Sequence, residues 1–525
     1  MSTTSENNKR IAKNTLLLYF RMLFMMIVSL YTSRVVLSTL GVEDYGLYNV
    51  VGGIVVVLSF LNSAIAGATQ RYLNFEMGRG GSVALKRVFS TSLLIHFIVS
   101  GVILLMAETL GLWFLNNHMV IAEDRIMAAN WVYQFSIASF ILTVLSVPYN
   151  ATIVAHEKMS AFAYISIIEV VLKLFIVYLI QVLLFDKLIM YGFLIMLISV
   201  TIRIIYGTYC KRKFIEATFS KQNIDKSLLK NMLSFSSWTI FGNLGYILHT
   251  QGIAIVINMF FGAAVNAAQG ISNQVNSAVS GFVSNFQMAL NPQIVKNYAA
   301  GNLEDMHKLM YRGCRFSFFL ISIFAIPLII EAPAILNFWL EEIPEYTIIF
   351  VRLILLISVC NSYSSIMATA QGATGKIKIY QITLTTIGAL HVPFTILLFY
   401  LDYEPYYCSW VYLAIIVILQ IVRISFVSRS TQMPIKGFIR MVLVPCFIVL
   451  IISSLIPCIL HQTISTNFGM TTVNIIMSFI WTFITIMCVG LEKSERHMIL
   501  ERINKKIRNI NSLRVQLNKN SPFKK

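Results

Sequence analysis

Apolar stretches of about 20 residues, each long enough to cross a bilayer core as a helix, recur from one end of this sequence to the other. The chain of 525 residues is 57% hydrophobic and only 12% charged. Because hydrocarbon satisfies no backbone hydrogen bonds, spanning segments of this length must be helical. We therefore expect an all-α polytopic membrane protein.

Fourteen transmembrane helices are predicted from apolar runs bounded by charges or turn residues. Their ranges are 14–37, 45–70, 88–113, 128–153, 161–183, 189–210, 231–259, 266–291, 314–338, 347–370, 378–400, 406–428, 438–460 and 470–490. Lys9, Arg10 and Lys13 precede the first run, but no convincing small-residue cleavage site follows it. We expect this span to be retained and not removed as a signal peptide.

Positive charge collects in alternate connections between these spans. Most of the 41 Lys and Arg residues lie in one set of connections and in the termini, whereas the other set carries mainly Asp and Glu. The positive-inside rule then predicts that both termini of this multi-pass protein are cytoplasmic. We expect the membrane to be the inner (cytoplasmic) one. This distribution accounts for the net charge of +18 without nucleic acid. The acidic connections are short, which leaves no room for an extracytoplasmic catalytic domain.

A basic link at 211–230 lies near the middle of the chain and predicts a hinge. It would separate an N-terminal six-helix bundle, 1–210, from a second one, 231–430, with two additional helices at 431–490. The tail, 491–525, places Ile and Leu at helical spacing among Lys and Arg. Such a basic amphipathic helix is expected to lie on the anionic inner leaflet, and binding to a partner is the alternative.

The two halves show an internal repeat. Aligning the chain with itself so that Gly41 falls on Gly262 also places Gly80 on Gly301. At nearly the same offset, the turn AHEK at 155–158 corresponds to ATGK at 373–376. Many transporters are built from repeated bundles that hold the substrate between them. We therefore predict two pseudo-symmetric six-helix bundles.

A polar stripe runs along the eighth span in alternating steps of four and three positions, which traces one helix face. Its members are small or polar: Asn266, Gly270, Asn273, Ser277, Ser280, Ser284, Gln287 and Asn291. The second span carries a similar stripe at the equivalent positions of the repeat. Close helix packing explains the small residues, whereas the amides favour a watered cleft for a ligand rich in hydroxyl groups. The candidate sugar contacts are Asn49, Ser59, Ser63, Asn273, Ser277, Ser280, Ser284 and Gln287.

Five basic residues remain inside the predicted spans, and we treat them as candidate phosphate contacts: Arg34, Arg21, Arg203, Arg352 and Lys173. A charge at bilayer depth costs at least about 2.5–3.5 kcal/mol and needs a partner, a ligand or a route to the interface. The surplus of arginine suits an anionic ligand, because guanidinium binds phosphate bidentately.

Each of these cations also has a structural alternative. Arg203 is near enough to the inner end of its span to reach the interface. Glu169 stands four positions before Lys173 and can neutralise it. Arg352 can pair with Glu345 or Glu341, and Arg34 with Glu43 or Asp44.

The sequence predicts neither a metal site nor a cofactor. Its seven cysteines form no CxxC pattern and have no histidine at ligand spacing. The segment QGATGKIK lacks the first glycine and the final Ser or Thr of a phosphate-binding loop. His96, His249 and His391 could serve proton coupling, although hydrogen-bonded core histidines are the more common case.

Taken together, the sequence resembles the multidrug, oligosaccharidyl-lipid and polysaccharide exporter (MOP) superfamily, in particular its branch of O-antigen flippases. The resemblance rests on TSRVVLSTLGVEDYGLYNVVGG, LSFSSWTIFGNLG, NPQIVKNYAAG and QGATGKIKIY. It implies a V-shaped pair of bundles that alternates access and moves a polyprenyl-pyrophosphate-linked oligosaccharide to the outer leaflet. In related flippases, cleft arginines on the first helix serve the pyrophosphate, which supports Arg34 and Arg21 here.

Three functions remain open at this stage. The first is a flippase for a lipid-linked O-antigen or capsular repeat unit, acting as a monomer among membrane lipids. The second is an exporter of drugs or small solutes coupled to protons or sodium ions, which the lack of an acid deep in the first span disfavours. The third is a membrane glycan polymerase or ligase, an enzyme that the short outer connections argue against.

Overall fold

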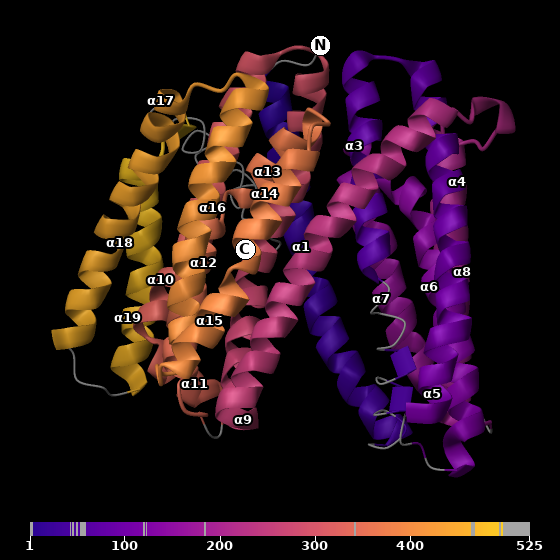
Figure 1. Cartoon of the computed structure of the whole chain (residues 1–525), viewed down its shortest axis with the longest axis horizontal. Helices are drawn as coiled ribbons and strands as arrows, with labels where there is room; N and C mark the ends of the chain where they lie inside the picture. Colours follow the sequence, from indigo (N-terminus) through magenta and orange to yellow (C-terminus); the bar gives the residue numbers. More distant parts are fainter. Residues whose placement is uncertain are drawn as a thin grey trace, which may run out of the picture. The chain divides into compact units, whose positions relative to one another are not determined.

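The computed structural model describes most of the chain as helix. The described residues are 4–41, 44, 47–48, 51–52, 59–118, 121, 123–182, 185–340, 343–463, 468–492 and 495–496. No strand occurs among them, and eleven segments within them are helices long and apolar enough to span a membrane. The prediction of an all-α polytopic membrane protein is confirmed (Figure 1).

Three predicted spans are not among these eleven: 45–70, 231–259 and 266–291. The first is described only in part, mainly in α3 (Ser59–Arg79). The other two form the two limbs of α9 (Lys226–Ala299), which meet at Gly262 with φ 80° and ψ −173°. The predicted tail lies outside the described residues from 497 onward.

Residues with positive φ occur at the turns that correspond to each other in the predicted repeat. Gly41 and Gly262 have φ of 83° and 80°, and Gly80 and Gly301 have φ of 80° and 79°. In the paired turns AHEK and ATGK, Glu157 and Gly375 have φ of 57° and 77° at equivalent places. Because few residues adopt positive φ, agreement at three pairs of turns supports the repeat that the sequence predicts.

The described residues divide into two compact units. The first contains Met1–Gly262, Gly281–Gly313 and Ser364–Met433, and the second contains Ala263–Ser280, Cys314–Tyr363 and Pro434–Lys525. The first unit thus includes the link at 211–230 and parts of both predicted bundles. The division of the chain at that link stays a prediction.

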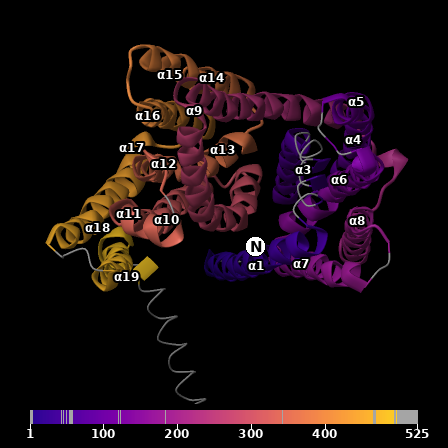
Figure 2. The ribbon, with the colours of Figure 1, turned by 90° about the horizontal axis from the view of Figure 1, so that it is seen from below.

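The N-terminal helices of the first unit pack closely on one another. Helix α6 contacts α8, α4 and α3, while α1 lies along α7 (Figures 1 and 2). The bounds of these N-terminal helices, including the short α5, are α1 Thr4–Leu40, α4 Ser82–Met106, α5 Leu112–His118, α6 Ile126–Ala155, α7 Met159–Val182 and α8 Lys187–Lys213. The later helices of this unit are α13 Ser364–Ala373, α14 Lys378–Ala389, α15 His391–Tyr400 and α16 Tyr407–Thr431.

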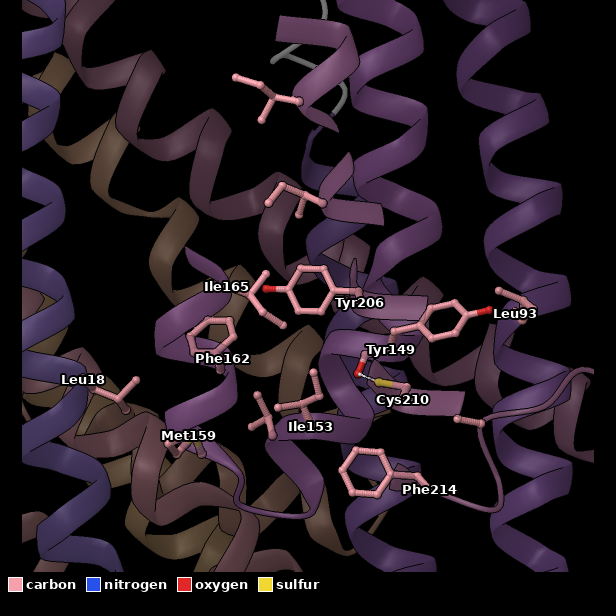
Figure 3. Packing of buried hydrophobic residues seen from close by; sticks show 14 of the residues in the cluster. Leu18, Leu93, Tyr149, Ile153, Met159, Phe162, Ile165, Tyr206, Cys210 and Phe214 are labelled. Carbon is pink, nitrogen blue, oxygen red and sulfur yellow. Dashed lines mark hydrogen bonds between the residues drawn. The ribbon is translucent and has the colours of Figure 1, made fainter. Parts of the chain in front are cut away.

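A buried hydrophobic core lies between α1, α6, α7 and α8. Tyr206 of α8 points toward Ile165 and Phe162 of α7, whereas Tyr149 of α6 points toward Leu93 of α4 (Figure 3). Tyr206 and Tyr149, on neighbouring helices, thus face different sides of this core.

The second unit is held by packing and by a buried ion pair. It contains α11 (Ala332–Trp339), α12 (Thr347–Asn361), α17 (Ile435–Phe438), α18 (Val444–Thr463), α19 (Phe468–Thr485) and most of α10 (Leu303–Ile330). Helices α18 and α19 pack on each other. In the N-terminal half of α10, Arg315 donates to Glu492 at 2.9 Å and to Glu495 at 2.7 Å.

Two helices extend beyond the spans that hydropathy predicts. Helix α3 ends at Arg79 and α9 at Ala299, whereas the predicted spans end at 70 and 291. The apolar run stops where polar residues begin, but each helix continues to the next left-handed glycine, Gly80 or Gly301. These extensions carry the contacts that close this end of the first unit. We call it the basic end, because the Lys-rich and Arg-rich connections 79–87 and 211–230 lie there.

At the basic end, α3 and α9 approach each other closely at Gly78. A Cβ atom built on Gly78 would meet the backbone oxygen of Lys296 and lie 2.8 Å from its Cα. Gly78 and Ala299 occupy equivalent places in the repeat. The absence of a side chain at Gly78 therefore permits the crossing of the two helices.

Gly78→Ala is expected to destabilise the protein, although alanine is the better helix former. The new Cβ meets backbone atoms that cannot rotate away, a kind of overpacking that costs about 1–3 kcal/mol. Thermal unfolding of the purified protein in detergent measures the effect. Gly67→Ala in the same helix is the matched control, because nothing lies within 4 Å of its new Cβ. Equal unfolding midpoints for the two variants would contradict the close crossing.

Candidate functional site

Arg21 of α1 is held by two other helices of the first unit, α7 and α9. Its Nη1 donates to Ser166 Oγ of α7 at 3.3 Å, and its Nη2 donates to Asn285 Oδ1 of α9 at 3.5 Å. The guanidinium carbon also lies 4.5 Å from the ring centre of Phe162. These neutral partners orient the charge without neutralising it.

The positive charge of Arg21 has no carboxylate partner within the described part of the chain. Its Nε atom is buried and has no hydrogen-bond partner there. The nearby acid on α7, Glu169, is bonded to Lys173 at 2.6 Å. Arg21 therefore combines two long, weak hydrogen bonds, one unused donor and an uncompensated charge, which is the chemistry that a phosphate group satisfies.

The other candidate cations lie in different surroundings. Lys173 forms the predicted pair with Glu169 and is 40% exposed. Arg203 of α8 lies over the ring of Tyr149, with 4.2 Å from the guanidinium carbon to the ring centre. The side chain of Arg34 lies outside the described residues. Among the five candidates, Arg21 is the one whose described contacts link both halves of the repeat.

Arg352 of α12 has a structural partner. Its Nε donates to the backbone oxygen of Ile329 at 2.9 Å. That oxygen has no helical donor, because Pro333 stands four positions later and carries no N–H. The alternative partner Glu345 forms no ion pair with Arg352 among the described residues, and Glu341 lies outside them. Arg352 thus completes a helix end in the second unit.

The candidate sugar contacts are only partly brought together. Ser63 of α3 accepts a hydrogen bond from Asn243 of α9 at 3.2 Å. Ser59, Ser63, Asn273, Ser277 and Ser284 are exposed, Ser280 is half-buried, and Gln287 is buried. Ser284 and Gln287 belong to the first unit, while Asn273, Ser277 and Ser280 belong to the second. Asn49 lies outside the described residues.

The sequence prediction missed two residues that contact Arg21. Asn285 stands one position away from the polar stripe, and Ser166 lies on α7, which carries no stripe of its own. The repeat could have indicated Asn285. Asn285 donates to Met22 Sδ of α1 at 3.1 Å, and the repeat places Asn243, which donates to Ser63, at the equivalent of Met22. The two contacts are nearly equivalent under the repeat.

At the basic end, Glu157 joins three segments. One carboxylate oxygen forms an ion pair with Arg10 Nε at 2.7 Å, and the other accepts hydrogen bonds from Lys296 Nζ and Gln293 Nε2 at 2.6 Å each. Its backbone oxygen accepts from Asn14 Nδ2 at 3.3 Å. The Glu157 side chain is only 2% exposed. The turn between α6 and α7 is thereby bonded to the start of α1 and to the end of α9.

Arg71 of α3, in the first half, binds a turn of the second half. Its Nε and Nη2 donate to the backbone oxygens of Gly372 and Ala373 at 2.5 and 3.0 Å, at the end of α13. The helix dipole favours a cation at this position. The rings of Tyr72, Phe75 and Phe235 surround the guanidinium at 4.6, 5.4 and 5.0 Å.

These two groups of contacts are related by the repeat, and we call them the Glu157 tie and the Arg71 tie. In the Glu157 tie, the end of the eighth span holds the turn AHEK of the first half. In the Arg71 tie, the end of the second span holds the turn ATGK of the second half. Each half therefore contacts the equivalent turn of the other half at the basic end of the first unit.

The family of the chain follows from its sequence. The family model described as polysaccharide biosynthesis protein matches residues 11–298, more than half of the chain. This chain belongs to the polysaccharide biosynthesis protein family. No curated protein sequence matches it. The matched region includes Arg21, Glu157 and Arg71.

Solved structures with a similar fold are transporters of the MATE family. A MATE structure in the bent conformation has a TM-score of 0.70 at 13% identity, with 81% of this chain and 96% of that chain covered. An outward-facing multidrug resistance MATE transporter of the MOP superfamily has a TM-score of 0.66 at 14% identity, covering 81% and 97%. The MATE transporter ClbM in complex with Rb+ has 0.66 at 13%, covering 80% and 97%.

At such low identity these likenesses show the fold alone. The chain thus belongs to the polysaccharide biosynthesis protein family and has the fold of the MATE transporters. Among the described residues, no group of three His, Cys, Asp or Glu side chains could hold a metal ion.

Glu157→Gln is expected to lower the free energy of unfolding by about 2–3 kcal/mol. Breaking a buried pair typically costs about 3–5 kcal/mol, and the cost is smaller here because Arg10 is 44% exposed. Chemical unfolding followed by circular dichroism measures it. Glu304→Gln is the control, since Glu304 pairs with Lys308 on the surface and surface pairs contribute little. Equal stability of the two variants would show that the Glu157 tie is not stabilising.

Proposed function

We propose that this member of the polysaccharide biosynthesis protein family moves a polyprenyl-pyrophosphate-linked oligosaccharide from the cytoplasmic to the outer leaflet of the inner membrane. The observation that carries the proposal is the Arg21 guanidinium, which has a buried Nε without a partner and no carboxylate among the described residues to balance its charge. A pyrophosphate supplies both the charge and the hydrogen-bond acceptors. Arg21 then binds the pyrophosphate.

Polar residues near Arg21 support a sugar ligand. Asn285, Ser166 and the exposed Ser284 offer amide and hydroxyl groups along α7 and α9. Such groups exchange hydrogen bonds with sugar hydroxyls as readily as with water. The polyprenyl chain requires no polar contact and stays in the lipid.

The two ties support alternating access as the mechanism. We infer that the basic end is cytoplasmic, because Lys and Arg collect there. With both ties formed, the first unit is closed at this end. Substrate entry from the cytoplasm then requires the Glu157 and Arg71 ties to break. For binding to drive this change, the substrate must bind at Arg21 with different affinities in the two conformations.

Replacing Arg21 tests the proposed substrate. A charge-assisted hydrogen bond contributes about 1.5–3 kcal/mol, so Arg21→Gln is expected to reduce transport about 10- to 100-fold. Arg21→Lys keeps the charge but loses bidentate geometry, so its loss should be smaller. The readouts are surface glycan and lipid-linked oligosaccharide retained on the inner leaflet of cells that depend on this gene.

Arg87→Gln is the matched control, because Arg87 is an exposed arginine at the start of α4. Unchanged surface glycan in a stably expressed Arg21→Gln variant would contradict the proposal. If drug resistance fell instead, the chain would be a small-solute exporter.

The two ties predict a second result. In protein whose native cysteines are replaced, Asn74→Cys places a thiol near the basic end of α3, where the side chain is only 1% exposed. Combining it with Glu157→Gln and Arg71→Gln should raise the rate of maleimide labelling from the cytoplasmic side several-fold, because the closed conformation loses both ties. Glu304→Gln again serves as the control. An unchanged labelling rate would show that the ties do not control access.

A further inference from the structure

A second group of cations lies on α8, where Arg203 contacts Tyr149 of α6. It lines a surface cavity of about 390 Å³ formed by Tyr149, Arg203, Ile204, Gly207, Thr208 and Lys211. The partners of Arg21 come from α7 and α9, whereas these residues come from α6 and α8. The two sites are therefore built by different helix pairs.

Three donor groups around this cavity have no acceptor among the residues that the structure describes. The Arg203 guanidinium lies on the ring of Tyr149 and forms no hydrogen bond or ion pair with any described residue. The same holds for the hydroxyl of Thr208 and the ammonium of Lys211 within the described residues. Two positive charges and one hydroxyl thus share one concave surface without an internal partner.

The backbone of α8 makes room for the arginine. A Cβ built on Gly207 would lie 3.0 Å from Nη1 of Arg203, so the guanidinium occupies the space that a side chain at position 207 would fill. Arg203 therefore extends along α8 toward Lys211, which stands eight positions later, a rise of about 12 Å. Helix α8 ends at Lys213. Both charges consequently lie near the level where the span meets the headgroups.

Glu216, in the connection that follows α8, does not balance these charges. Glu216 is bonded to His156 at 2.5 Å. Burial is the largest influence and opposes ionisation, but the bond to His156, a backbone hydrogen bond and the charges of His156 and Lys86 together lower the pKa of Glu216. The carboxylate is thereby engaged with histidine. An external anion is left to satisfy Arg203 and Lys211.

The surroundings of the cavity are apolar and exposed. Ile204, on its rim, is 60% exposed, and α8 is long and apolar enough to span a membrane. An exposed isoleucine on such a helix faces lipid tails, so the cavity opens toward the bilayer. A ligand with an anionic head and an apolar tail fits both parts.

We propose that this cavity binds the phosphate headgroup of an anionic bilayer phospholipid. Arg203 and Lys211 contact the phosphate oxygens, Thr208 donates its hydroxyl, and the acyl chains lie along Ile204. This inference does not depend on the proposed substrate, because the site shares no residue with the contacts of Arg21.

Native mass spectrometry of the purified protein in detergent tests the proposal with phosphatidylglycerol, compared with phosphatidylcholine. A basic residue near an anionic lipid contributes about fivefold in affinity. The double variant Arg203→Gln with Lys211→Gln should therefore bind phosphatidylglycerol about 25-fold more weakly. Gly207→Leu should also weaken binding, because leucine fills the cavity while the charge is unchanged.

The matched control is Arg212→Gln with Lys213→Gln, which removes the same charges from the same helix end outside the cavity. This control should bind phosphatidylglycerol like the native protein. Equal losses in the two double variants would overturn the proposal in favour of diffuse surface charge. Displacement of the lipid by an equal concentration of inorganic phosphate would instead identify a free-phosphate site. Preference for a polyprenyl diphosphate would identify a substrate site. Thermal unfolding of each variant shows whether a loss reflects misfolding.

Discussion

A polar group keeps a fixed place inside a membrane protein only where another group meets it, because hydrocarbon offers no hydrogen bonds. The cations of this chain follow that constraint in different ways. Lys173 has Glu169, Arg352 has the carbonyl oxygen that Pro333 leaves free, and Arg71 has the end of α13. Arg21 has hydroxyl, amide and aromatic neighbours that hold it without cancelling its charge. Of these four cations, Arg21 is therefore the one best suited to an anion brought from outside.

Much of the fold could be predicted from sequence because the signals are local. Apolar length predicts the spans, and glycine at fixed spacing predicts turns that need positive φ. The alignment of the two halves agrees with left-handed residues at three pairs of turns. The helix ends were predicted less well, since α3 and α9 continue through polar residues to their glycines.

The site could be predicted only in part because its contacts join distant segments. Arg21 stands out in the sequence as a charge in an apolar run, but nothing near it indicates Ser166 or Asn285. Glu157 reads as one residue of a turn, and Lys296 lies 139 positions away. In a chain with so many basic residues, no sequence pattern indicates which of them reach a buried carboxylate. Arg71 is harder still, because its acceptors are backbone oxygens.

The turn shared by the two ties is built differently in each half. Position 157 carries a carboxylate, while its equivalent, position 375, is glycine. The carboxylate is charged and forms ion pairs with Arg10 and Lys296, whereas Arg71 is held by neutral backbone oxygens. One of the two symmetry-related ties is therefore an ion-pair network, and the other consists of hydrogen bonds to a helix end. A duplicated architecture thus contains a chemical asymmetry at its basic end.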